Sequence, residues 1–98
     1  MTGEKVGNDN VVFIGIKPFM NYVTSVAMQF TAKNKNEVVI KARGKWTSRA
    51  IDVAESVMKR FLKDRQISVK DIKIDSNEVE NKEGKKVRVS SIEIILRK

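Results

Sequence analysis

Basic side chains gather at two neighbouring points of the sequence, and the chemistry open to them is the binding of phosphate groups. Lys17 follows one short apolar run, and Lys41, Arg43, Lys45 and Arg49 lie in and after the next. Lysine and arginine bind phosphate oxygens through charged hydrogen bonds, and a helix that begins beside them adds free backbone N–H groups. The alternative is a set of scattered, solvated cations with no ligand.

A further basic cluster lies near the C-terminus, around a turn over residues 81–86 in which Gly84 is free to adopt positive φ. A projecting two-stranded arm with a basic tip can follow a nucleic-acid groove. Charged residues also keep an exposed sheet edge from aggregating, and the sequence leaves both explanations open. The cluster consists of Lys82, Lys85, Lys86 and Arg88.

Most catalytic chemistries lack their residues here. The 98 residues include no cysteine and no histidine, which excludes disulfides, thiolate or imidazole metal sites and the common nucleophile–base pairs. Asp52 and Glu55 lie one turn apart, but Arg49 and Lys59 beside them favour surface ion pairs. We therefore expect no enzyme, metal, cofactor or small-molecule substrate. The remaining carboxylates lack the spacing of a calcium loop, namely Asp71, Asp75, Glu78 and Glu80.

The overall charge favours a polyanionic partner. Twenty lysines and arginines against twelve acidic residues leave a formal charge of +8 and a pI near 9.9. No apolar run is long enough to cross a membrane, and the N-terminus does not resemble a signal peptide. We expect a cytoplasmic protein with no membrane partner.

Alternating hydrophobic periods predict the elements that position these cations. Residues 1–10 are polar and predict a flexible arm, followed by a single domain over residues 11–98. Residues 11–16 form a continuous apolar run, typical of a strand buried on both faces. A strand is expected over residues 37–43. Amphipathic helices are expected over residues 19–30 and 47–63, the second with Phe61 on its apolar stripe.

The last third of the chain predicts two antiparallel strands. Apolar residues alternate over 67–74 and 87–96, with phase slips near residues 70–71 and 90–91 that indicate bulges or a core face that ends partway. The result is an α+β fold, a two-layer β-α-β-α-β-β sandwich with a four-stranded mixed sheet and a protruding C-terminal β-hairpin. The first two strands are parallel, so both strand-to-helix junctions face the same partner.

The sequence resembles the Alba family of archaeal chromatin proteins over nearly the whole chain after the N-terminal arm. A G-x-K-P-x-M-N-Y block followed by a K-A-R-G block is specific to that family. The stretches that carry the resemblance are NVVFIGIKPFMNYV from Asn10, EVVIKARGK from Glu37, SRAIDVAE, KRFL and the closing VRVSSIEIILRK.

The resemblance implies a homodimer that binds and compacts double-stranded DNA with little sequence preference, binds RNA, and associates with the chromosome or nucleoid. It implies that the dimer body lies on the duplex, that the arms reach flanking minor grooves, and that Phe61 forms a dimer–dimer contact. The nucleic-acid-binding residues expected from the charge pattern and the resemblance are Lys17, Asn21, Tyr22, Lys41, Arg43, Lys45, Arg49, Lys82, Lys85, Lys86 and Arg88.

Two positions depart from the family pattern. Ile16 stands where the family commonly has a lysine that is reversibly acetylated, so Lys17 would have to take its place. Trp46 is an atypical aromatic residue, which either packs over the second helix or stacks on a base. These departures suggest a divergent paralogue, with altered RNA preference or a heterodimeric partner.

Two other functions compete with duplex binding. In the first, the protein is an RNA-binding ribonucleoprotein subunit for which DNA is incidental. Single-strand binders usually offer several aromatic platforms, and the one Trp and one Tyr provide few. In the second, the hairpin carboxylates and a divalent metal form a nuclease, which the lack of histidine and of a convergent acidic cluster disfavours.

Overall fold

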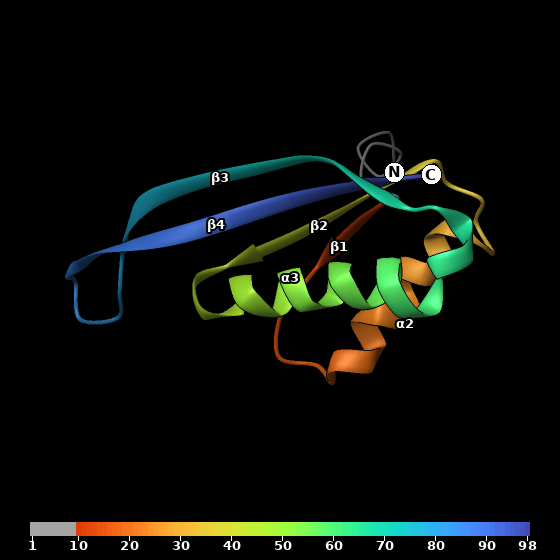
Figure 1. Ribbon diagram of the computed structural model, residues 1–98. Coiled ribbons are helices and arrows are strands. Elements are labelled where there is room, and N and C mark those ends of the chain that lie inside the picture. Colours follow the sequence, from red (N-terminus) through yellow and green to blue (C-terminus); the bar gives the residue numbers. More distant parts are fainter. Residues whose placement is uncertain (1–9) are drawn as a thin grey trace, which may run out of the picture.

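The computed structural model describes residues 10–98. The N-terminal arm predicted over residues 1–10 lies outside these residues, except for Asn10. A four-stranded mixed sheet forms one layer and two helices form the other (Figure 1), which confirms the predicted fold class. The elements are β1 (Val11–Phe13), α2 (Phe19–Phe30), β2 (Glu37–Arg43), α3 (Thr47–Ser56), β3 (Ser68–Glu80) and β4 (Lys86–Arg97).

The strand order is β1-β2-β4-β3, with β1 and β2 parallel and the other neighbours antiparallel. Because β1 and β2 are parallel, the chain leaves both strands at the same end of the sheet. The loops that lead into α2 and α3 therefore lie side by side at the end of these two strands, as the sequence predicted. Asn10 already belongs to the sheet edge, since its carbonyl accepts a hydrogen bond from the Val39 amide at 2.8 Å.

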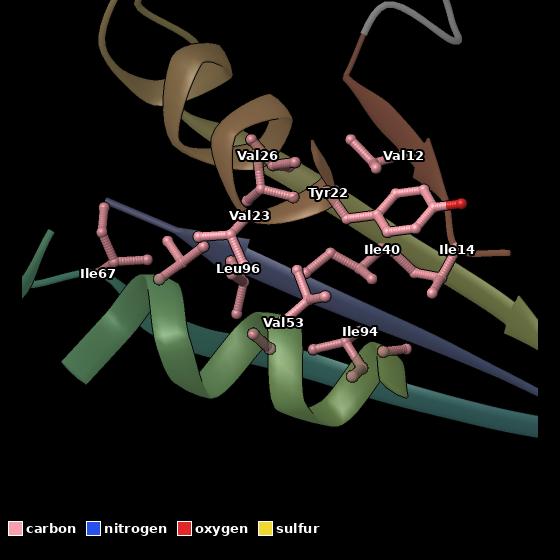
Figure 2. Close-up of a cluster of buried hydrophobic side chains, with 14 of the residues drawn as sticks. Val12, Ile14, Tyr22, Val23, Val26, Ile40, Val53, Ile67, Ile94 and Leu96 are labelled. Atoms are coloured by element: carbon pink, nitrogen blue, oxygen red, sulfur yellow. The ribbon is translucent and has the colours of Figure 1, made fainter. Parts of the chain in front are cut away.

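The core lies between the helices and one face of the sheet (Figure 2). Alternate residues of β2 are buried, and the helices contribute residues at three- and four-residue spacing. Each buried valine, isoleucine or phenylalanine stabilises the fold by about 1.5–3 kcal/mol relative to an exposed one. The largest fully buried side chains are those of Phe30, Ile40, Leu96, Val23, Val26, Val38, Val53 and Val57.

The prediction of a strand over residues 11–16 buried on both faces is wrong. β1 ends at Phe13, whose side chain is 67% exposed, and Ile16 is 85% exposed. The helices cover only one face of the sheet, and no element of the described residues covers the other. The continuous apolar run over residues 11–16 therefore does not correspond to a strand that is buried on both faces of the sheet.

The second helix is close to the prediction but changes its winding. Regular α-helix ends at Ser56, and the chain continues in a wider π-helical turn over Val57–Phe61. The amide of Leu62 donates to the carbonyl of Val57 at 2.9 Å, which closes that turn. Phe61 is 51% exposed, so its expected place on the buried stripe is wrong.

The two phase slips in the C-terminal strands have different causes. A bulge between Val69 and Asp71 shifts the β3 register, as one alternative predicted. At Ser90 and Ser91 the pairing is unbroken, so the core face ends there instead. Beyond that point β3 and β4 project past α3 as a two-stranded arm (Figure 1). We call the hairpin over residues 76–90 the arm.

Candidate nucleic-acid interface

A buried tyrosine shapes the loop between β1 and α2. The hydroxyl oxygen of Tyr22 accepts hydrogen bonds from the backbone amides of Gly15 and Lys17, both at 3.0 Å. Only 7% of Tyr22 is exposed, and its ring packs in the core (Figure 2). Tyr22 therefore lies beneath the predicted interface and fixes the backbone from which the Lys17 side chain projects.

Arg49 ties the two strand-to-helix junctions together. Its guanidinium Nη1 donates to the carbonyl oxygens of Gly15 at 2.9 Å and of Lys17 at 2.6 Å. The residue lies in the first turns of α3, while its acceptors precede α2, 32 and 34 positions earlier in the chain. Sequence reasoning placed Arg49 among the phosphate contacts; the geometry makes it a clamp on the loop that carries Lys17.

Trp46 connects this clamp to the next basic residue. Its ring lies 5.0 Å from Lys45 Nζ and 5.5 Å from Arg49 Cζ, measured to the ring centroid, which is within cation–π range. The ring is half-buried and packs against the core, in agreement with the packing alternative. Gly44, at φ +57°, turns the chain sharply so that Lys45 and Trp46 follow the end of β2 directly.

The ends of the parallel strands β1 and β2 and these contacts bring four cations together. We call this group the basic junction, and it consists of Lys17, Arg43, Lys45 and Arg49. Lys17, Arg43 and Lys45 are exposed, and Arg49 is half-buried. The loop segments 15–18 and 43–50 that form the junction contain no acidic residue. Like charges held close together raise the local positive potential, which attracts a polyanion. Asn21 is exposed beside Lys17 and lines a shallow hollow with it.

Lys41 does not join the basic junction. Its side chain lies on the open face of the sheet, where Nζ is 3.4 Å from Glu93 Oε2 and 5.8 Å from the centroid of the Phe13 ring. The β2–β4 register places Lys41 directly opposite Glu93. Lys41 and Arg43 share the open face of β2, but only Arg43 stands at the strand end that forms the junction, and Lys41 is occupied by Glu93.

The arm carries acidic residues among its cations. Over residues 76–90 the chain holds four basic and three acidic side chains. Glu78 pairs in register with Arg88, and Glu80 pairs with Lys86. The side chain of Arg88 donates to Ser76 Oγ at 3.2 Å. The four predicted contacts of the arm, including Lys82 and Lys85 at the tip, are all exposed, and the arm is almost neutral overall.

An apolar patch on the helix side of the sheet escaped sequence reasoning. Ile72 and Ile74 of β3 are exposed, Ile74 by 79%, and Ile74 lines one hollow with the exposed Ile51 of α3. The register places Ile74 opposite Ile92 of β4 on the same face. The sequence contained a sign of this patch, because the apolar alternation of β3 continues over more residues than two short helices can cover. We call Ile51, Ile72 and Ile74 the isoleucine patch.

Other sequence expectations concern the acidic residues and the membrane. Glu55 and Lys59 form the predicted ion pair one turn apart on the second helix, at 2.9 Å. Among residues 10–98, no group of three or more His, Cys, Asp or Glu side chains is placed so that it could hold a metal ion. Within the same part of the chain, every helix is too short or too polar to span a bilayer.

Comparison with known proteins places the chain in a family. The sequence profile of the Alba family matches residues 10–76. The protein named DNA/RNA-binding protein Alba from Nanoarchaeum equitans is 60% identical over 86 residues, which cover 87% of this chain and 93% of the relative. The protein of the same name from Methanococcus maripaludis is 47% identical over 88 residues, covering 90% and 97% respectively.

The fold is also similar to a solved structure. Alba from Thermoplasma volcanium superposes with a TM-score of 0.81 at 43% sequence identity, covering 91% of this chain and all of that chain. The matched region includes both strand-to-helix junctions and the helices that follow them. The chain therefore belongs to the Alba family.

Proposed function

We propose that this protein is a homodimer that binds double-stranded DNA, and also RNA, with little sequence preference, and that it compacts DNA as an architectural protein of the chromosome. The observation that carries the proposal is the basic junction, whose two loop segments bring four cations together and contain no acidic residue. Relatives that cover most of the chain are named for DNA and RNA binding. Members of the Alba family are nucleic-acid-binding architectural proteins rather than enzymes.

The chemistry of the junction favours backbone contacts over base recognition. Lysine and arginine side chains on two short loops can reach phosphates that follow one another along a duplex. Base recognition needs an element that enters a groove with donors and acceptors matched to base edges. The Arg49 guanidinium already donates to two backbone carbonyls of the Lys17 loop, so the cations left for phosphate are Lys17, Arg43 and Lys45.

The isoleucine patch supports the dimer. Exposed apolar side chains that lie side by side favour association, because burial removes their surface from water. A second copy presents the same patch, so a symmetric pair would cover both patches at once. A paralogue with an equivalent patch would form a heterodimer in the same way. We propose further that the exposed Phe61 side chain contacts the next dimer along DNA.

The test is a titration of labelled duplexes of about 20 base pairs, one of DNA and one of RNA, at several salt concentrations. Binding through about six phosphates per dimer predicts that log K falls with log salt at a slope of roughly −5. Affinity that does not change with salt would contradict the proposal. Strong binding of RNA with weak binding of DNA would favour the ribonucleoprotein alternative instead.

A mass measurement tests the assembly. We expect twice the chain mass in light scattering for the native protein, and the single-chain mass for Ile74→Glu, because a charge cannot be buried in an apolar contact without a partner. Ile16→Glu is the matched control, since Ile16 is more exposed than Ile74 but lies outside the patch. A native protein of single-chain mass would contradict the dimer.

A further inference from the structure

An exposed aromatic ring lies on the open face of the sheet, away from the isoleucine patch. Val12 and Ile14 are buried in the core, so the intervening Phe13 points to the opposite face. Its side chain is exposed and adds little to the core, so stability alone does not explain a phenylalanine there. Lys41 Nζ lies 5.8 Å from the ring centroid, so a cation adjoins the ring.

Phe13 borders a hollow that extends from β1 across β2 and β4 to β3. The register places Lys41 and Lys73 on either side of Glu93 in one row across the sheet, and the Lys41–Glu93 contact occupies part of this row. Three basic and two acidic side chains line the hollow, which leaves a positive excess. The lining side chains that matter here are Phe13, Lys41, Arg43 and Lys73.

We propose that this hollow binds an unpaired nucleotide of a single-stranded segment, with its base stacked on Phe13 and its phosphates near Lys41 and Arg43. This rests on the proposed function, because Arg43 belongs both to the basic junction and to the lining of the hollow. Aromatic side chains stack on the flat face of any base, and lysine and arginine side chains donate charged hydrogen bonds to the phosphates on either side of it.

The geometry selects an unpaired base over a duplex. In a double helix the flat faces of the bases are covered by their neighbours, and only their edges reach the grooves. A ring such as that of Phe13 therefore has no partner in an intact duplex but has one in a loop, a bulge or a strand end. Stacking does not depend on the sugar, so RNA and DNA segments are equally suited.

The experiment measures fluorescence anisotropy of labelled oligoadenylates of about ten nucleotides, as RNA and as DNA, beside a fully paired DNA duplex. Phe13→Ala is expected to weaken binding of both oligoadenylates by about tenfold and to leave duplex affinity unchanged. Phe13→Trp, which keeps a stacking surface, should restore the native affinity. Met28→Ala is the matched control, because Met28 is an exposed apolar side chain on α2 that does not line the hollow.

Unchanged oligoadenylate binding in Phe13→Ala would overturn the proposal, as would an equal loss for the duplex. A change in molar mass of that variant would also overturn it, because the ring would then belong to a contact between copies. The salt titration of the duplex tests the proposed function separately. Salt-independent duplex binding would refute that function. The effect of Phe13→Ala on oligoadenylate affinity tests only the proposal that the hollow binds an unpaired nucleotide.

Discussion

The basic junction and the arm carry the same number of cations but differ in what surrounds them. Each holds four lysines and arginines, yet the junction loops contain no acidic residue and the arm contains three. In the arm, Glu78 and Glu80 lie in register with Arg88 and Lys86, so the opposite charges are close together. A count of lysines and arginines therefore overstates the arm, because attraction to a polyanion follows net charge.

The two regions also differ in how their backbones are held. The junction backbone is fixed by two side chains from within the fold, the buried hydroxyl of Tyr22 and the guanidinium of Arg49. At the arm tip, the Asn81 side-chain oxygen accepts from the amides of Glu83 and Lys85, at 2.9 and 3.0 Å, on an exposed turn. The junction is thus preorganised by the core, whereas water competes for the bonds of the arm tip.

The largest expected effect comes from removing charge at the junction. Arg43→Ala combined with Lys45→Ala is expected to weaken duplex binding by about 100-fold and to make the salt slope shallower by roughly 3.6, since each protomer loses two phosphate contacts and the dimer loses four. The measurement is the salt titration of the labelled duplex. Lys63→Ala is the control, because Lys63 is exposed beyond the opposite end of α3.

The conclusion that the junction contributes more to duplex binding than the arm would be wrong if the double substitution Lys85→Ala and Lys86→Ala weakened binding as much as the junction variant. The expected loss for the arm variant is only about threefold, because the neighbouring glutamates already offset much of its charge. A loss that depended on DNA sequence in either variant would indicate base recognition instead of backbone contact.

A smaller effect is expected from the backbone support of each region. Tyr22→Phe leaves the amides of Gly15 and Lys17 without their acceptor, so the free energy of unfolding should fall by about 1–3 kcal/mol, measured by urea denaturation. Asn81→Ala removes an oxygen with the same two-bond role from the arm. Because water can replace it there, the expected loss is below about 1 kcal/mol. Equal losses would show that the two turns are supported alike.

The smallest effect concerns the acidic residues of the arm. Glu78→Gln combined with Glu80→Gln releases Arg88 and Lys86 from their opposite charges without removing any cation. Duplex affinity should rise by about twofold to threefold, and the salt slope should become slightly steeper. Unchanged affinity at low salt would mean that the arm lies away from the duplex. Glu55→Gln, on the second helix, is the control for a general change in net charge.

Much of this architecture could be predicted because it depends on local patterns. The helical spacing of apolar residues in α2 and their alternation in β2 determine which residues face the core. Because β1 and β2 are parallel, both strand-to-helix junctions must lie at the same end of these strands. The residues that form the junction were therefore identifiable. Their individual roles were not, because the contacts of Arg49 join positions more than 30 residues apart.

The sequence by itself determined the order of the elements, the excess of positive charge and the adjacency of the two junction loops, since these follow from hydrophobic period and chain connectivity. Only the tertiary structure decided that Arg49 clamps a loop, that Lys41 faces Glu93, and that Phe13 and the isoleucine patch remain exposed. The reason is that exposure and pairing depend on which face of the sheet another element covers and on strand register, and neither is encoded in the spacing of residues along a single strand.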